Sequence, residues 1–301
     1  MERSSAELVL AELLELAPGG VEEVDLGDQV EYALYGAPGE LPSLPALTAA
    51  ASSGGALLDV HTTEVADDWS ERWRTFHRPV VIAAPMPASV PTPAAPARAS
   101  PAIRIRPPWE PPGDGSGVTQ EIVIDPGQAF GTGAHATTRL CLELLLELSA
   151  ERPPAGPLLD VGCGSGVLAI VAGRLGYTPV VALDNDLLSV QATAENAAVN
   201  GVELDVRRAD LRTDPLPVGD LLDEGFGRAP VVVCNLLRGL LLELAGVLPF
   251  APRALIASGL LEGEGEEVAG AFEATLGMRA RRRTAGAGWE AIRLEGPGGG
   301  A

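Results

Sequence analysis

The glycine-rich stretch at residues 158–166 has the spacing of a ligand-binding turn. Two apolar residues and Asp160 are followed by three glycines at alternate positions, Gly162, Gly164 and Gly166. This pattern predicts a buried strand that ends in a tight turn and leads into a helix. Because glycine has no Cβ, a ligand can touch the backbone of such a turn, and the N–H groups at the start of the helix favour a carboxylate or a phosphate. The alternative is a closely packed turn that binds nothing.

The order of the glycines separates two classes of ligand. A dinucleotide-binding turn has the order G-x-G-x-x-G, which requires a third glycine at position 167, where the chain has Val167. Here the third glycine is Gly166, and the acidic Asp160 lies two positions before the first. This arrangement resembles the first motif of class I S-adenosylmethionine-dependent methyltransferases. A nicotinamide-dependent dehydrogenase is the more distant alternative.

A second glycine-rich segment, residues 125–138, leads into another predicted helix and is called the roof loop below. A hydroxyl group that caps this helix accounts for one of the threonines in the loop, but not for its glycines or for His135. His135 is interpreted either as a base or as a residue that stabilises the loop. The roof loop is predicted to cover the ligand bound at the first glycine turn.

Three further predicted strands each end at a polar residue, namely Asp184, Asp210 and Asn235. Asp184 follows Gly162 by 22 residues, close to the offset of about 20 at which an acidic side chain accepts hydrogen bonds from ribose hydroxyls. Asp210 falls where this type of fold places a residue near an adenine edge. Asp186 is interpreted as the N-cap of the following helix. Because parallel strands end at one edge of a sheet, the ligand site is expected at that edge.

The order of the predicted elements indicates an α/β protein with a doubly wound, Rossmann-like sheet and a smaller N-terminal α+β domain. An aromatic helix face formed by Trp69, Trp73 and Phe76 is expected to pack against a domain and not to stack on bases. The predicted divisions are an acidic α+β domain at residues 1–78, a Pro-rich linker at 79–118, the sheet domain at 119–295 and a disordered tail at 296–301.

The composition and net charge of the chain limit the classes of partner and of catalytic residue. The net charge of −20 disfavours a nucleic-acid backbone as the direct partner, and residues 1–78 hold fifteen acidic residues against four arginines. All 21 basic residues are arginines, so a catalytic lysine is excluded. Three singly spaced cysteines indicate buried thiols and neither a metal site nor a disulfide framework. Without a predicted signal peptide or membrane span, a cytoplasmic protein with no membrane partner is expected.

Four motifs together resemble the ribosomal protein L-eleven methyltransferase (PrmA) family. The roof loop discriminates best, because methyltransferases in general have the glycine turn but not Gly-Thr-Gly-x-His-x-Thr-Thr. The likeness extends over residues 67–294, whereas the run of prolines at 85–101 and Leu-Leu-Arg-Gly-Leu at 236–240 depart from the family pattern. The motifs and supporting segments are Asp125–Thr138, Asp160–Gly166, Asp184, Val231–Leu237, Trp69–Pro79, Ser258–Leu261 and Gly288–Glu290.

The resemblance implies an N-terminal substrate-recognition domain, a flexible linker and a class I methyltransferase domain that binds S-adenosyl-L-methionine. Carried over by position, it implies that Thr138, Gly162, Asp184 and Asn235 contact the cofactor. Asn235 is also a candidate for orienting the acceptor amine. The complete predicted cofactor-binding set is Thr138, Gly162, Gly164, Asp184, Asp210 and Asn235.

The implied activity is N-methylation of lysine and/or N-terminal amines of ribosomal protein L-eleven, with the acidic N-terminal domain as its docking face and the enzyme as a monomer. Two alternatives remain open. One is a methyltransferase for another protein lysine or a small-molecule amine. The other is a non-catalytic S-adenosylmethionine-binding factor in ribosome assembly.

Overall fold

The computed structural model describes residues 9–10, 13, 21–25, 30–34, 47–48, 77–84, 102–115, 117–127, 131, 133–222 and 229–296. The chain divides into two compact units, one of residues 1–73 with 128–130 and one of residues 74–127 with 131–301. The predicted aromatic helix face at Trp69, Trp73 and Phe76 lies outside the described residues. The predicted domain boundaries at residues 78, 118 and 295 stay predictions.

In the N-terminal unit, the described residues include a β-hairpin. Its strands β1 (Glu22–Asp25) and β2 (Val30–Ala33) pair antiparallel, with Glu22 opposite Ala33. The apolar pattern of the sequence predicts strands at residues 21–26 and 29–35 that are joined as a hairpin, and this pairing is confirmed. A small apolar cluster of this unit comprises Val9, Leu13, Val21, Tyr32, Leu34 and Leu47.

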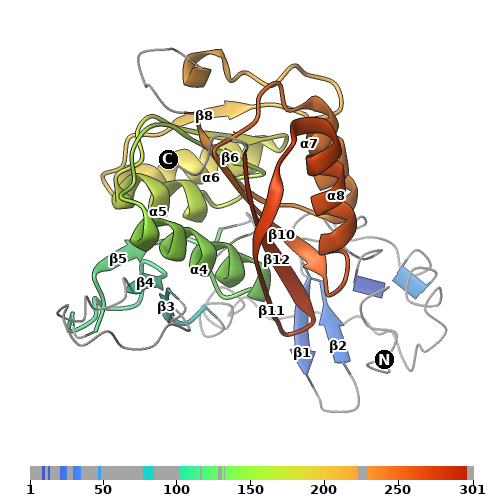
Figure 1. The fold of residues 1–301 in the computed structure, drawn as a ribbon. Helices are drawn as coiled ribbons and strands as arrows, with labels where there is room; N and C mark the ends of the chain where they lie inside the picture. Colours follow the sequence, from blue (N-terminus) through green and yellow to red (C-terminus); the bar gives the residue numbers. More distant parts are fainter. Residues whose placement is uncertain are drawn as a thin grey trace, which may run out of the picture. The chain divides into compact units, whose positions relative to one another are not determined.

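A seven-stranded sheet with the order β11-β12-β10-β9-β6-β7-β8 forms the centre of the second unit (Figure 1). Strands β10, β9, β6, β7 and β8 are parallel, and β12 is antiparallel to both of its neighbours. The predicted doubly wound sheet is thereby confirmed. The strands are β6 (Leu158–Val161), β7 (Val180–Asp184), β8 (Asp205–Arg208), β9 (Val231–Asn235), β10 (Ala254–Leu261), β11 (Arg279–Gly286) and β12 (Trp289–Glu295).

The order of the strands fixes where a ligand belongs. From β6 the chain proceeds outward through β7 and β8, and it then returns to place β9 on the other side of β6. The carboxyl ends of β6 and β9 therefore flank the topological switch point, where open parallel sheets form their binding crevice. The glycine turn follows β6, and Asn235 ends β9.

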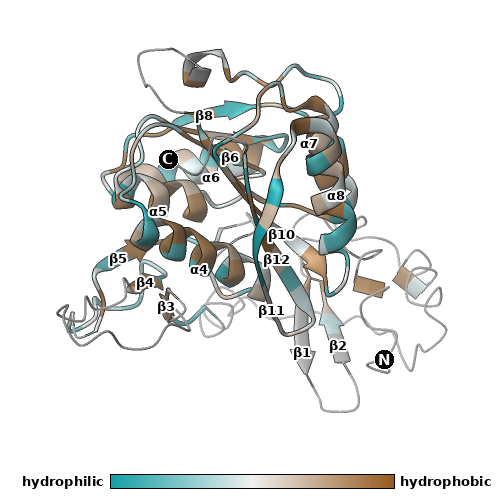
Figure 2. Cartoon of the chain, in the orientation of Figure 1, coloured by the Kyte–Doolittle hydropathy of each residue, from teal (hydrophilic) through white to brown (hydrophobic). Residues whose placement is uncertain are grey.

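Helices cover both faces of the sheet, with α4, α5 and α6 on one face and α7 and α8 on the other (Figure 1). Alternate residues of β9 belong to different cores: Val231 and Val233 face the first and Val232 and Cys234 the second. This two-sided burial explains the uninterrupted apolar runs of the central strands, which are brown in Figure 2. The helices are α4 (Ala136–Glu151), α5 (Val167–Leu175), α6 (Leu187–Val199), α7 (Arg238–Val247) and α8 (Gly265–Leu276).

None of the helices in the described ranges is long and apolar enough to cross a membrane. The N-terminus of α6 is capped as predicted, because Asp186 accepts hydrogen bonds from Leu188 N and Ser189 N. The helix stops at Asn200, and Gly201 follows with a φ of +61°. These local signals were sufficient to predict its bounds.

A separate three-stranded sheet precedes the roof loop. Strand β4 (Ala102–Arg106) pairs antiparallel with β3 (Val80–Ala83) and parallel with β5 (Gln120–Val123). The inner side chains of this sheet, among them Ile103 and Ile122, are buried in the same core as α4 and α5. The region predicted as a Pro-rich linker thus contributes two strands to the second unit.

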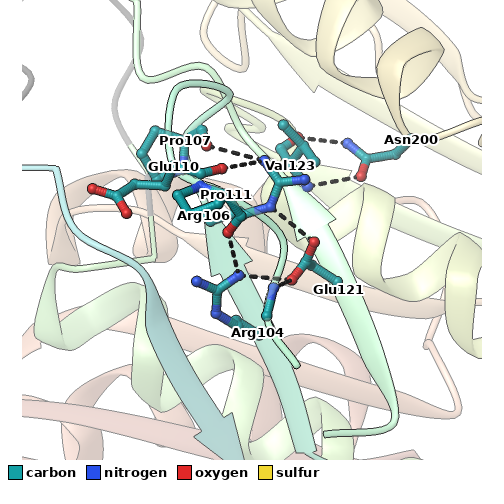
Figure 3. Close-up of polar contacts among 9 residues, drawn as sticks. Arg104, Arg106, Pro107, Glu110, Pro111, Glu121, Val123 and Asn200 are labelled. Carbon is teal, nitrogen blue, oxygen red and sulfur yellow. Dashed lines mark hydrogen bonds and ion pairs between the residues drawn. The ribbon is translucent and has the colours of Figure 1, made fainter. Parts of the chain in front are cut away.

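On the outer face of this small sheet, one carboxylate joins two arginines and a loop backbone (Figure 3). Glu121 accepts hydrogen bonds from Arg104 Nη1 at 2.7 Å, Arg106 Nε at 2.8 Å and Gly113 N at 2.8 Å. Burial opposes its ionisation, but these donors outweigh burial and lower the pKa of Glu121 to about 2. The guanidinium groups also donate to the carbonyl oxygens of Pro107, Glu110 and Pro111.

Candidate active site

The glycine turn after β6 is tied to β7 by a backbone hydrogen bond and is closely packed against the side chains of Leu236 and Thr193. Gly162 N donates to Leu183 O at 2.8 Å, which ties the turn to β7. Gly162 has a φ of +77°, and a Cβ there would lie 2.4 Å from Leu236 Cδ2. Gly166 has a φ of +81°, and its Cβ would lie 2.8 Å from Thr193 Cγ2. The turn therefore requires glycine at both positions, for conformation and for space.

Asp184, at the end of β7, holds the middle of this turn. Its Oδ2 accepts from Gly164 N at 2.9 Å and its Oδ1 accepts from Asp186 N at 3.0 Å. Burial raises the pKa of Asp184, and these two backbone N–H groups oppose that effect. The predicted pairing of a glycine turn with an acidic strand end is thus present in the structure.

Asp160 lies below the turn and is completely buried. Its Oδ2 accepts from Ala169 N at 3.0 Å, whereas its Oδ1 has no hydrogen-bond partner within the described part of the chain. Burial raises the pKa of Asp160 to about 7; the Ala169 N–H lowers it, and the charge of Asp184 raises it. The three cysteine thiols are free and buried, as predicted, and burial raises the pKa of each: Cys141, Cys163 and Cys234.

Asp160→Asn is expected to remove the pH dependence of stability that this buried carboxyl causes. Because the pKa of Asp160 in the folded state (about 7) exceeds the ordinary aspartate value of 3.8, the folded state keeps a proton that the unfolded state releases between these two pH values. The free energy of unfolding of the wild type therefore falls as pH rises from 4 to 7, by up to about 1.4 kcal/mol per pH unit. Asp160→Asn has no such titration and still accepts from Ala169 N. In urea unfolding at pH 5 to 8, the free energy of unfolding of the variant relative to the wild type should rise with pH. Parallel pH profiles of the two proteins would contradict this.

The described part of the roof loop, residues 125–127, 131 and 133–138, is joined to the glycine turn and to β9. Ser165 Oγ donates to Gly131 O at 2.6 Å. Asn235 Nδ2 donates to Thr138 Oγ1 at 3.3 Å. Two of the predicted cofactor contacts, Thr138 and Asn235, therefore touch each other at the switch point.

His135 begins the helix that follows the roof loop. Its ring nitrogen Nδ1 accepts from Thr137 N at 3.4 Å and lies 2.8 Å from Thr137 Oγ1. The ring meets Trp289 edge-on, with 5.3 Å between centroids, and burial lowers the pKa of His135. The expectation that a threonine hydroxyl caps α4 is wrong, because the imidazole is the cap. These contacts favour the loop-stabilising interpretation of His135.

The segment after β9 is held between the glycine turn and β10. Leu236 N donates to Ser258 O at 3.0 Å, and a Cβ at Gly259 would lie 2.4 Å from Leu236 O. Leu236 also fills the space beside Gly162. This close packing fixes the backbone that carries Asn235.

Asp210 follows β8 and stabilises its own turn. Its Oδ1 accepts from Arg212 N at 2.9 Å, and its N–H donates to Asp214 Oδ2 at 3.0 Å. The preceding residue, Ala209, donates its N–H to Asp184 O at 2.9 Å, which joins the ends of β8 and β7. The adenine contact of Asp210 stays a prediction.

Sequence reasoning missed two asparagines of α6. Asn196 donates to Ser165 O at 2.9 Å and accepts from Asp125 N at 2.9 Å, and Asn200 bonds to Val123. The available signal was a pair of amides four residues apart on one helix face. Within the described ranges, no group of three or more His, Cys, Asp or Glu residues could hold a metal ion.

The doubly wound sheet with antiparallel β12, together with the glycine turn and the acidic end of β7, defines a class I S-adenosylmethionine-dependent methyltransferase. Within this class, residues 92–296 match the family described as Ribosomal protein L11 methyltransferase (PrmA). The chain belongs to that family. The resemblance inferred from the sequence motifs is confirmed.

Individual relatives agree with this assignment. A ribosomal protein L11 methyltransferase of Pelotomaculum thermopropionicum is 36% identical over 259 residues, which cover 84% of this chain and 73% of the relative. One from Bordetella parapertussis is 44% identical over 168 residues, 55% of this chain and 50% of the relative, so the match spans half of that protein. A solved ribosomal protein L11 methylase from Lactobacillus delbrueckii subsp. bulgaricus has a TM-score of 0.52 at 28% identity and covers 64% of this chain and 94% of its own.

Proposed function

We propose that this protein transfers methyl groups from S-adenosylmethionine to lysine and/or N-terminal amines of ribosomal protein L11. The observation that carries the proposal is the joining of the glycine turn to Asp184 through Gly164 N, beneath a roof loop of the family type. Membership of the PrmA family supports both the cofactor and the substrate.

The residues present fit this cofactor. Gly162, Gly164 and Gly166 carry no side chains that would keep a ligand from the backbone of the turn, and Asp160 retains one buried oxygen without a hydrogen-bond partner in the described part of the chain. When bound, S-adenosylmethionine supplies a methyl group made electrophilic by a sulfonium. We assign Asp184 to the ribose hydroxyls by its position at the end of β7. The residues proposed to hold the cofactor are Thr138, Gly162, Gly164, Asp184, Asp210 and Asn235.

Catalysis on this proposal requires positioning, and no nucleophilic residue. A lysine amine has a pKa near 10.4 in water and must be neutral to react, so the site favours transfer by desolvating the amine and excluding water. Asn235 orients the amine or the cofactor through its amide, whose Nδ2 is directed to Thr138. His135 holds the roof loop and stays neutral because burial lowers its pKa. Alignment of the two reactants supplies much of the rate.

The acidic N-terminal unit is proposed as the docking face for the ribosomal protein. Residues 1–78 carry fifteen acidic residues against four arginines, which suits a basic partner. We propose further that the enzyme acts as a monomer in the cytoplasm, without direct contact to nucleic acid or membrane. The net charge of −20 supports the absence of direct contact with nucleic acid and membrane, because it repels phosphate groups.

A panel of acceptors tests the substrate. The full-length protein is incubated with labelled S-adenosylmethionine and, separately, with ribosomal protein L11, another basic ribosomal protein of similar size, and free lysine. Label is expected in ribosomal protein L11 alone. Equal labelling of the other ribosomal protein, or label only in free lysine, would contradict the proposed substrate in favour of another protein or a small amine.

A further inference from the structure

Asn196 of α6 and Asn200, which caps the end of this helix, pair with the open edge of β5 and with the chain just beyond this strand. Asn200 accepts from Val123 N at 2.9 Å and donates to Val123 O at 2.6 Å (Figure 3). One turn earlier, Asn196 accepts from Asp125 N at 2.9 Å and donates to Asp125 O at 3.3 Å. The two amides thus satisfy alternate residues of the extended backbone as a neighbouring strand would. The other edge of β5 is occupied by β4.

Asn196 has a second contact that Asn200 lacks. Its Nδ2 donates to Ser165 O at 2.9 Å, in the middle of the glycine turn, and its side chain is 3% exposed. Ser165 in turn donates its Oγ to Gly131 O at 2.6 Å. Asp125 and Gly131 both belong to the roof loop, so Asn196 and Ser165 together join two points of this loop to the turn beneath it.

On its other side, β5 is tied to β4 by an ion-pair cluster, but the start of the roof loop at Asp125 lies beyond the end of this strand. Arg104 and Arg106 both bond to Glu121 on this strand, at 2.7 and 2.8 Å (Figure 3). Strand β5 is therefore held by β4 as well as by the asparagine side chains. The amide of Asn196 connects Asp125, at the start of the roof loop, to Ser165 O in the glycine turn.

We propose that Asn196 is a positioning residue for S-adenosylmethionine: it holds the roof loop in register above the glycine turn, and cofactor affinity depends on it. The inference rests on the proposed function, since it assumes that the cofactor binds between these two segments. Loss of the amide leaves the buried Ser165 carbonyl without its donor and frees the start of the loop. Cofactor binding must then restore the order of the loop, at the expense of affinity.

The matched variants are Asn196→Ala and Asn200→Ala. Each loses an amide that bonds to both the N–H and the C=O of one residue, Asp125 for Asn196 and Val123 for Asn200. Asn200→Ala also loses a bond to Asn196 O within the helix end, and both variants are expected to lower the melting temperature. Only Asn196→Ala removes the contact with the glycine turn. Calorimetric titration of the full-length variants with S-adenosylmethionine is expected to show about tenfold weaker binding for Asn196→Ala and less than about threefold for Asn200→Ala.

A double-mutant cycle with Ser165→Ala supplies the second readout. If Asn196 and Ser165 act on one loop, the double variant binds S-adenosylmethionine more tightly than the product of the single effects predicts. The KM for S-adenosylmethionine should rise in Asn196→Ala while kcat at saturating cofactor stays within about twofold.

Equal weakening in Asn196→Ala and Asn200→Ala would overturn the inference, as would unchanged binding in Asn196→Ala or strictly multiplicative effects in the cycle. Failure of the wild type itself to bind S-adenosylmethionine would instead overturn the proposed function. The two failures are therefore distinguishable in the same titrations.

Discussion

Removal of residues 1–73 is expected to abolish methylation of ribosomal protein L11 and to leave the dissociation constant for S-adenosylmethionine within about threefold of the full chain. The cut removes the first compact unit except for residues 128–130, which remain in the truncated chain. Every residue proposed to hold the cofactor, from Thr138 to Asn235, lies in the second unit. The truncated chain therefore keeps its cofactor site but loses the acidic surface proposed to dock the basic substrate.

Methyl incorporation and calorimetric titration are measured on the same preparations. Salt provides an independent control: in the full chain, the KM for ribosomal protein L11 should rise with ionic strength more steeply than the KM for S-adenosylmethionine, because charge attracts the protein substrate. Methylation of ribosomal protein L11 by the truncated chain at the full-length rate would contradict the docking role. Loss of cofactor binding would contradict the independence of the two units.

Asp184→Ala is expected to weaken S-adenosylmethionine binding by about a hundredfold. The carboxylate accepts from Gly164 N and Asp186 N, so its loss removes the support of the glycine turn as well as the proposed bonds to ribose hydroxyls. Charge-assisted hydrogen bonds of this kind contribute about 1.5–3 kcal/mol each, and about 2.7 kcal/mol corresponds to this loss of affinity. Calorimetric titration with S-adenosylmethionine measures it.

Asp186→Ala is the matched control, two residues further along. Asp186 caps α6 through Leu188 N and Ser189 N and has no proposed contact with the cofactor. Its loss should lower the free energy of unfolding by about 1 kcal/mol and change cofactor affinity by less than about threefold. If both variants weaken binding equally, Asp184 acts only through the stability of this region and the proposed ribose contact is wrong.

Local backbone requirements explain what the sequence predicts correctly. The glycines of the turn, the N-cap at Asp186 and the acidic end of β7 each express a constraint between residues close in the chain, so spacing alone reveals them. The position of Asn235 at the edge of the sheet follows from strand order in a doubly wound sheet, whereas Thr138, in helix α4, was expected only from the resemblance to the family. Their mutual hydrogen bond at 3.3 Å agrees with that placement.

Contacts between distant residues explain what the sequence does not predict. Asn196 reaches Asp125 across 71 residues, and its amide has no local partner that marks it in advance. Glu121 bonds to Arg104 and Arg106, which lie in the segment expected to be a linker; the strands themselves were expected, but their pairing and this cluster were not. The N-cap of α4 differs from the expected threonine. The ring of His135 packs on Trp289 and accepts the hydrogen bond from the Thr137 N–H that a threonine hydroxyl was expected to accept.

The intact mass of ribosomal protein L11 after incubation with the full-length protein and S-adenosylmethionine tests the central claim most directly. Transfer of each methyl group replaces one hydrogen and adds about 14 Da, so a ladder of such steps is predicted, absent when the cofactor is omitted and strongly reduced with Asp184→Ala at low cofactor concentration. An unchanged mass of ribosomal protein L11, while a parallel titration shows that this chain binds S-adenosylmethionine, would contradict the proposed methyltransferase activity. It would indicate a non-catalytic cofactor-binding factor instead.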